Sequence, residues 1–122
     1  MNVLLLGSGG REHAIVRALR KSPGVGRIDV APGNAGMSAE TPCHPVDLTN
    51  PDAMLELAAA LNPDLVIIGP EGPLCLGVAD SLRKEGHVVF GPGRQGAMLE
   101  GSKSYAKAFM KRHGIPTADF DI

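Results

Sequence analysis

A glycine-rich segment near the N-terminus is the first place where this sequence could bind a ligand. Residues 7–13 read GSGGREH and directly follow the short apolar run of residues 3–6. Glycines allow backbone N–H groups to approach an anion closely, and the N-terminus of a following helix adds a partial positive charge. The segment therefore predicts a ligand-binding turn between a strand and a helix. A tight turn that binds nothing is the alternative interpretation.

This turn differs from the dinucleotide-binding fingerprint GxGxxG. Glu12 stands where the third glycine should be. The acidic residue expected at the end of the second strand is also missing, because Ala31 and Pro32 stand there and Asp29 comes two positions too early. The pattern does not predict a dinucleotide site.

Glu71 is the second candidate for a binding residue. It lies in the segment GPEGP, residues 69–73, immediately after another apolar run, between Pro70 and Pro73. A carboxylate held with little backbone freedom at the end of a strand suits a ligand ammonium or hydroxyl group. The alternative is a surface acid that is favoured by the dipole of the next helix.

Other suggestive patterns do not hold. The segment GAMLEGSKS, residues 96–104, resembles a phosphate-binding P-loop, but Ser102 separates Gly101 from Lys103 and no strand directly precedes it. The three lysines spaced by four on the last helical stretch are interpreted as a solvated basic face. The four histidines lack the spacing of a metal site, and no nucleophile–histidine arrangement can be argued from their order.

These candidate residues need a scaffold, and the apolar pattern predicts one. Short apolar runs predict buried strands at residues 3–6, 27–31, 65–68 and 87–90. Helical spacing and capping residues predict helices at residues 12–21, 51–61, 74–85, 94–100 and 102–113. Residues 32–36 are expected to form a loop, residues 44–46 a short extended piece, and residues 117–122 a final strand or linker.

The alternation of strands and helices predicts an α/β fold, a doubly wound, Rossmann-like parallel sheet with helices on both faces. Ligands of such sheets bind beyond the carboxyl ends of the strands. In this sequence those ends lead into the loops that begin at Gly7, Pro32, Gly69 and Gly91. The binding site is therefore expected among these four loops.

Composition narrows the classes of partner. The 122 residues suffice for one domain, and the net charge of −1 argues against a nucleic-acid or membrane-surface binder. Aromatic residues make up only 3 %, which argues against base-stacking platforms. The two cysteines form no CxxC pair, and no signal or membrane-spanning segment is apparent, so a cytoplasmic location is expected.

Five motifs occur in order along the whole chain: GSGGREHA at 7–14, APGNAG at 31–36, GPEGPL at 69–74, LEGSK at 99–103 and GIPT at 114–117. Together they resemble the phosphoribosylamine–glycine ligase family, the glycinamide ribonucleotide synthetases. Enzymes of this family are several hundred residues long, and this sequence stops near the expected start of their ATP-grasp module. The resemblance implies that residues 1–116 are the N-terminal substrate-binding domain. Residues 117–122 would begin a linker or strand toward that module.

The resemblance also implies an activity. It is the joining of 5-phosphoribosylamine to glycine with cleavage of ATP to ADP and phosphate, a step of de novo purine biosynthesis. The implied substrate-binding residues are Gly9, Gly10, Arg11, Glu12, Asn34, Gly36 and Glu71, and Lys103 would lie near the ATP phosphates. The catalytic residues and the ligands of Mg²⁺ or Mn²⁺ would lie outside this chain, which alone is expected to be inactive. A monomer is favoured.

Two alternatives stay open from the sequence. One is another ATP-grasp relative, such as a biotin carboxylase-like or carboxylating purine enzyme. The GGREH run and the GPEGP loop weigh against this alternative. The other is a free-standing module that binds a nucleotide or sugar phosphate without catalysis.

Overall fold

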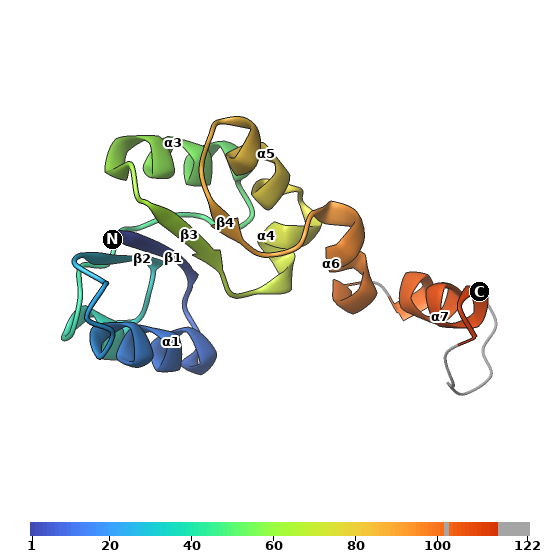
Figure 1. Ribbon diagram of the computed structural model, residues 1–122, viewed down its shortest axis with the longest axis horizontal. Coiled ribbons are helices and arrows are strands. Elements are labelled where there is room, and N and C mark those ends of the chain that lie inside the picture. The colour runs from blue at the N-terminus through green and yellow to red at the C-terminus, as the bar shows by residue number, and fades with distance from the viewer. Residues whose placement is uncertain (102, 115–122) are drawn as a thin grey trace.

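Four short parallel strands form the centre of the molecule in the computed structural model, which describes residues 1–101 and 103–114 (Figure 1). The strands are β1 (Val3–Gly7), β2 (Ile28–Pro32), β3 (Leu65–Ile68) and β4 (Val89–Phe90). Their order in the sheet is β2-β1-β3-β4, and each neighbouring pair is parallel. The predicted parallel α/β sheet is confirmed, although β4 is shorter than the predicted strand at residues 87–90.

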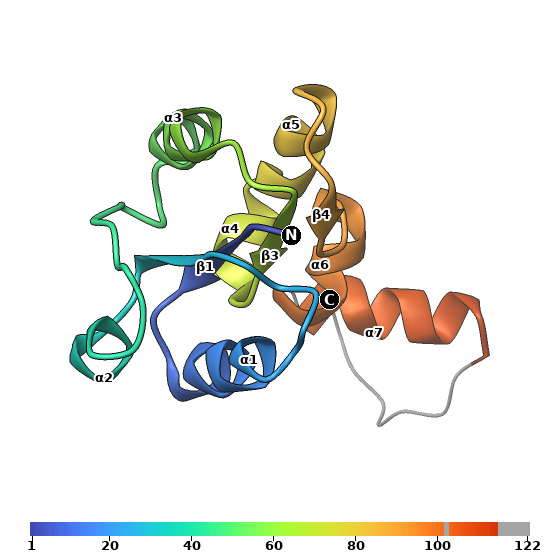
Figure 2. The same cartoon turned by 60° about the vertical axis from the view of Figure 1, so that its left-hand side comes forward.

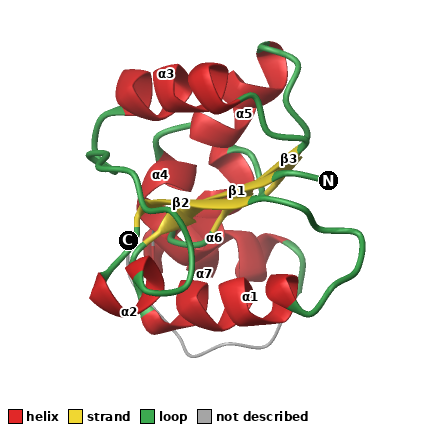
Figure 3. Cartoon of the chain, turned by 90° about the vertical axis from the view of Figure 1, so that its left-hand side faces the viewer, coloured by secondary structure: helices red, strands yellow, loops and turns green. Residues whose placement is uncertain are grey.

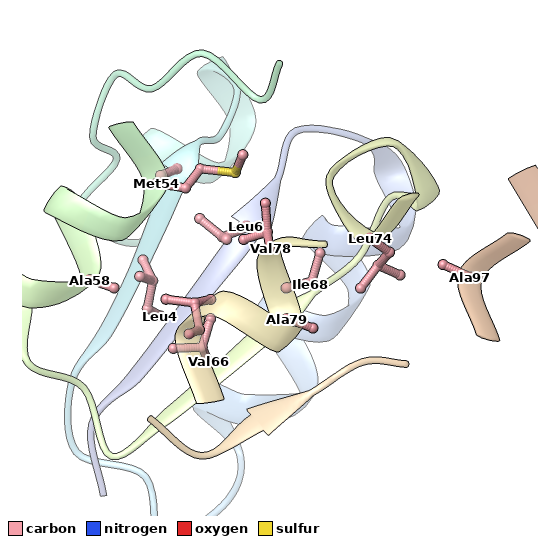
Figure 4. Close-up of a cluster of buried hydrophobic side chains, with 12 residues drawn as sticks. Leu4, Leu6, Met54, Ala58, Val66, Ile68, Leu74, Val78, Ala79 and Ala97 are labelled. Atoms are coloured by element: carbon pink, nitrogen blue, oxygen red, sulfur yellow. The ribbon is translucent and has the colours of Figure 1, made fainter. Parts of the chain in front are cut away.

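Helices cover both faces of the sheet, as Figure 3 shows. The helices α1 (Gly10–Arg20) and α2 (Ala35–Ser38) lie on one face, and α3 (Pro51–Leu61), α4 (Glu71–Cys75) and α5 (Val78–Lys84) lie on the other. Successive residues of a strand point to opposite faces, so Leu4 and Leu6 pack toward α3, α4 and α5, whereas Val3 and Leu5 pack toward α1. The larger of the two clusters is drawn in Figure 4.

Both clusters are well buried. Leu4, Leu5 and Leu6 are each 0 % exposed, and burial of one such side chain contributes about 1.5–3 kcal/mol. The buried apolar residues on the two sides of β1 hold the carboxyl ends of the strands at fixed relative positions. No helix in the described part of the chain is both long and apolar enough to cross a membrane.

The first of the two C-terminal helices packs on the larger core cluster through Ala97, and the second lies farther from the sheet. The helix α6 (Arg94–Gly101) follows β4, and α7 (Lys103–Arg112) lies beyond it (Figures 1 and 2). Gly114 follows α7 with a φ of 69°, which fits its predicted place after the end of a helix. The predicted strand or linker at residues 117–122 lies outside the described residues, so the proposed domain boundary stays a prediction.

The predicted single helix at residues 74–85 was wrong. The structure has two helices instead, because Gly77 adopts a left-handed φ of 80° between α4 and α5. The first of them also begins earlier, at Glu71, since Pro73 occupies the first turn, where a residue needs no backbone N–H donor.

One further expectation was wrong around residues 32–48. The expected loop at 32–36 already contains the start of α2, which Asn34 caps. The expected extended piece at 44–46 begins beside β2 without joining the sheet as a strand, since Cys43 makes an isolated parallel bridge with Val30 and the His44 N–H donates to the Val30 carbonyl at 2.8 Å. The helix α1 also begins at Gly10, before the predicted start at residue 12.

Candidate functional site

Three loops meet at the carboxyl edge of the sheet. The register pairs Leu6 with both Ala31 and Ile68, so β1, β2 and β3 end level with one another. The loops that follow them are joined by backbone hydrogen bonds. The N–H of Gly33 donates to the carbonyl of Gly7, and the N–H of Gly69 donates to the carbonyl of Leu6, each at 3.0 Å. The predicted convergence of these loops is confirmed, and they form the candidate site.

The first loop presents hydrogen-bond donors to solvent. Gly9 is the N-cap of α1, and no side chain caps the helix there. The first N–H groups of a helix have no acceptor within the helix, and the helix dipole makes this end partly positive. Residues 8–11 are exposed, so both these N–H groups and the Arg11 side chain are open to a ligand. This end of α1 can bind an anion or a hydroxyl group.

Asn34 ties the second loop to the first. Its Oδ1 accepts a hydrogen bond from the Met37 N–H at 3.0 Å and so caps α2. Its Nδ2 donates to the Ser8 carbonyl at 2.8 Å. Asn34 was predicted to line the binding cleft, and the structure shows that both ends of its amide already have partners, one that caps α2 and one that joins the two loops. A contact between Asn34 and the substrate stays a prediction.

Gly36 lies against the ring of His13. A β-carbon at position 36 would come within 3.1 Å of His13 Cε1, so a larger residue there would push on the ring. The ring is itself held, because His13 Nε2 lies 2.9 Å from Glu40 Oε2. The hydrogen bond with His13, together with the charge of Arg17, keeps the pKa of Glu40 below its ordinary value. Gly36 therefore allows α1 and α2 to approach closely.

Glu71 is the carboxylate that the third loop offers to solvent. It is the first residue of α4, follows the N-cap Pro70, and is exposed. Within residues 1–101 and 103–114, no hydrogen bond or ion pair involves its side chain. In the first turn of α4 its negative charge also interacts favourably with the helix dipole. The position of Glu71 therefore fits both interpretations, a ligand-binding carboxylate and a surface acid at a helix N-terminus.

Glu12 has the opposite environment. It is only 6 % exposed and lies beneath the first loop, between Gly7 and Gly69. The resemblance of the chain to the family predicts a place for Glu12 in a turn that faces the substrate, but nothing in that prediction indicates its burial. One signal could have done so, because a glutamate at the third position after an N-cap often turns back over the start of its helix.

A second buried acid, Asp29, was not predicted to matter. Its carboxylate accepts hydrogen bonds from Arg27 Nε at 2.8 Å and from the Arg27 terminal nitrogen at 3.0 Å, and His44 Nε2 lies 2.8 Å away. Burial would raise the pKa of Asp29, but its hydrogen bonds with Arg27 and His44 outweigh burial and keep that pKa below its ordinary value. This cluster fastens the segment around His44 to β2, near the start of the strand.

Lys103 is the first residue of α7, and its predicted role near the ATP phosphates stays a prediction. Among the described residues, no group of three or more His, Cys, Asp or Glu side chains could hold a metal ion. The residues present do not fit a metal site of their own.

A doubly wound parallel sheet with glycine-rich loops at its carboxyl edge is typical of α/β domains that bind small molecules at that edge. Comparison with known families agrees with this class. The model of the family "Phosphoribosylglycinamide synthetase, N domain" matches residues 1–100, and the chain belongs to this family.

Individual relatives support the same family assignment. The phosphoribosylamine–glycine ligase of Mycobacterium tuberculosis (strain CDC 1551) is 50 % identical over 122 residues, which cover 100 % of this chain and 29 % of the relative. The crystal structure of the Thermotoga maritima ligase matches with 38 % identity and a TM-score of 0.70, over 99 % of this chain and 27 % of that one. The chain thus spans less than a third of the length of these relatives.

A more distant solved structure shares the fold alone. N5-carboxyaminoimidazole ribonucleotide synthetase from Thermotoga maritima superposes with a TM-score of 0.69 at 19 % identity, over 97 % of this chain and 32 % of that one. The resemblance to the glycine ligases that the five motifs indicated is confirmed at the level of the family.

Proposed function

We propose that this chain is the substrate-binding N-terminal domain of an ATP-dependent phosphoribosylamine–glycine ligase that acts in de novo purine biosynthesis. The observation that carries the proposal is the 50 % identity over 122 residues to relatives of that name. The convergence of three motif-bearing loops at one sheet edge supports it. The whole enzyme would act in the cytoplasm, and we expect it to be a monomer.

In the proposed reaction, the glycine carboxylate attacks the terminal phosphorus of ATP, and ADP leaves. The amine of phosphoribosylamine then attacks the resulting acyl phosphate, the amide bond forms, and inorganic phosphate leaves. The relatives are ligases that imply ATP and a divalent metal ion in general. The residues of this chain bind and orient the amine substrate, and Lys103 would lie near the phosphates of ATP.

The charges of the site suit phosphoribosylamine. The exposed N–H groups of Gly9 and Gly10 and the guanidinium of Arg11 offer donors to its phosphate or hydroxyl groups. Glu71 offers an unpaired carboxylate that can accept a hydrogen bond from the amine or a ribose hydroxyl. Asn34 and Gly36 would line the same cleft and shape it, and Glu12 would act from below.

An assay of the full-length protein tests this proposal. We expect ADP release that requires both phosphoribosylamine and glycine, with glycinamide ribonucleotide as the product. Omitting either substrate is the control, and it should reduce ADP release to the background rate. ADP release that depends on bicarbonate instead would contradict the proposal and support a carboxylating relative.

A further inference from the structure

Glu12 is an acid with an unusual position for a residue of a binding loop. It is 6 % exposed, whereas Ser8, Gly9, Gly10 and Arg11 beside it are all exposed. In the described part of the chain, no hydrogen bond or ion pair satisfies its carboxylate. Its oxygens still reach solvent, because no fully buried side-chain oxygen or nitrogen in the described residues lacks a hydrogen-bond partner. The burial of the rest of the side chain therefore has to be explained by the residues packed around it.

Three glycines from two different loops surround this carboxylate. A β-carbon at Gly7 would lie 2.3 Å from Glu12 Cγ, and one at Gly69 would lie 2.4 Å from Glu12 Oε1. A β-carbon at Gly9 would come within 3.1 Å of Oε2. Contacts under 3 Å force one of the two atoms to move, so a side chain at position 7 or 69 would displace the end of the Glu12 side chain from this place.

Backbone conformation does not explain Gly69. Gly7 has a φ of 149° and would be strained with any side chain, but Gly69 is not among the residues with positive φ. The space that Glu12 occupies is therefore the reason that position 69 excludes a side chain. Gly72, three residues later, has open space around its missing β-carbon and serves as a matched control.

We propose that Glu12 is a positioning residue, whose buried side chain fills the glycine-lined gap between the carboxyl ends of β1 and β3 and fixes the spacing of the two loops that carry the binding groups. On one side of the gap lie the donors of Gly9 and Gly10, and on the other lies Glu71. The inference rests on the proposed function, because the spacing matters only if the groups on the two sides of the gap bind one substrate.

This role differs from direct contact with the substrate. Glu12 is only 6 % exposed, whereas Glu71 is exposed at the same edge, so Glu71 offers far more of its surface to a ligand. The packing of the side chain, more than its charge, is what the surrounding glycines require. Shape and charge can be separated by substitution.

The first test measures stability and needs no activity. We expect Gly69→Ala to lower the melting temperature of the full-length protein by about 5 °C or more, and Glu12→Ala to lower it as well. If the two residues compete for one space, the double variant should melt no lower than Glu12→Ala alone. Gly72→Ala should not lower the melting temperature.

Additive losses in the double variant would overturn the inference. If Gly69→Ala fails to fold, recovery of folded protein in the double variant supports the inference, and failure to recover contradicts it.

The second test measures kinetics in the full-length protein. We expect Glu12→Ala to reduce kcat/KM for phosphoribosylamine about tenfold or more, with the KM for ATP changed by less than about twofold. Glu12→Gln keeps the shape and should retain most of the activity. If Glu12→Gln is as impaired as Glu12→Ala, the charge of Glu12 matters more than its packing, and the inference is wrong.

The two tests also separate this inference from the proposed function. Absence of ligase activity in the unchanged protein would contradict the proposed function, while the coupling of positions 12 and 69 would still be measured by melting. Conversely, an active ligase in which the two substitutions are additive would contradict the inference alone.

Discussion

Two carboxylates at the same sheet edge, Glu71 and Glu12, have different physical environments. We therefore expect them to have different roles. Glu71 is exposed and has no partner in the described residues, so its carboxylate is free to accept a hydrogen bond from a ligand. Glu12 is only 6 % exposed and packs among glycines, so it offers little surface to a ligand. Their types alone do not distinguish these roles, because both are glutamates in the first turn of a helix that follows a strand.

Glu71→Gln in the full-length protein tests the contact with the amine substrate. Loss of a charge-assisted hydrogen bond should cost about 1–3 kcal/mol, which lowers kcat/KM for phosphoribosylamine roughly ten- to a hundredfold. The KM for ATP should stay nearly the same. Steady-state kinetics and the melting temperature are measured together, with Glu56→Gln on the exposed surface of α3 as the control.

The opposite pattern would assign Glu71 a structural role. A helix N-terminal acid contributes only a few tenths of a kcal/mol up to about 1 kcal/mol to stability and nothing to kinetics. Unchanged kinetics with a slightly lower melting temperature would therefore refute the substrate contact.

Asp29→Asn tests the buried ion cluster through its dependence on pH. The carboxylate is 6 % exposed and holds Arg27 and His44, so at pH 7 the substitution should lower the free energy of unfolding by about 1–3 kcal/mol. The pKa of Asp29 in the folded state lies below its ordinary value of 3.8. Its stabilising contribution is therefore complete well above pH 3.8 and is lost as the pH falls through the lower, folded-state pKa.

Urea unfolding of both proteins at several pH values from neutral to strongly acidic measures this contribution. The difference between wild type and Asp29→Asn should be largest near neutral pH and should shrink in acid. A difference that stays constant across the range would show that the charge of Asp29 does not stabilise the fold.

At the scale of elements, local signals explain which parts of the fold were predictable. The helix α3 was predicted with its bounds because Asn50 is an N-cap, Pro51 is the first helical residue, and the apolar spacing is regular. The pair α4 and α5 was predicted as one helix because its apolar spacing continues across Gly77. Only the left-handed conformation at Gly77 separates the two helices, and a glycine in a sequence allows that conformation without requiring it.

The candidate site was predictable in its location but not in its internal contacts. The end of each strand is marked by a glycine or proline, so the loops could be assigned to one edge before the structure was known. The hydrogen bond from Asn34 to Ser8 and the close approach of Gly69 to Glu12 join segments that are 26 and 57 residues apart. Such contacts depend on the register of the sheet, which no local pattern specifies.

Substitutions at the two ends of α3 should affect the stability of the protein in different directions. Asn50→Ala removes the side chain that accepts a hydrogen bond from the Ala53 N–H at 3.3 Å, so the free energy of unfolding should fall by about 1 kcal/mol. Asn62 ends the helix with a φ of 46°, a conformation that glycine adopts without steric cost, so Asn62→Gly should leave stability unchanged or raise it. Chemical denaturation of both variants checks the signs, and a stability loss at Asn62→Gly would contradict this account of the cap.

At the scale of the whole molecule, the centre of the sheet and its carboxyl edge are two different environments. Helices and apolar clusters on both faces make the centre rigid, while the carboxyl edge presents exposed glycine loops and the exposed carboxylate of Glu71, which has no partner among the described residues. A rigid centre with an open edge can hold one substrate in a fixed orientation. Orientation alone does not supply the phosphoryl transfer that the proposed ligase requires.

We therefore predict that this domain binds the substrate and that the rest of the full-length polypeptide carries out phosphoryl transfer. Relatives named phosphoribosylamine–glycine ligase are matched over only 29 % of their length, and the described residues contain no group of acids or histidines that fits a metal ion. We expect residues 1–122 alone to unfold cooperatively, because both faces of the sheet carry a buried cluster, yet to release no ADP with phosphoribosylamine, glycine and ATP. The full-length protein at equal concentration is the positive control. ADP release by the isolated chain that depends on both substrates would show that this domain carries the chemistry as well as the binding, and the proposed role as a substrate-binding domain would then be too narrow.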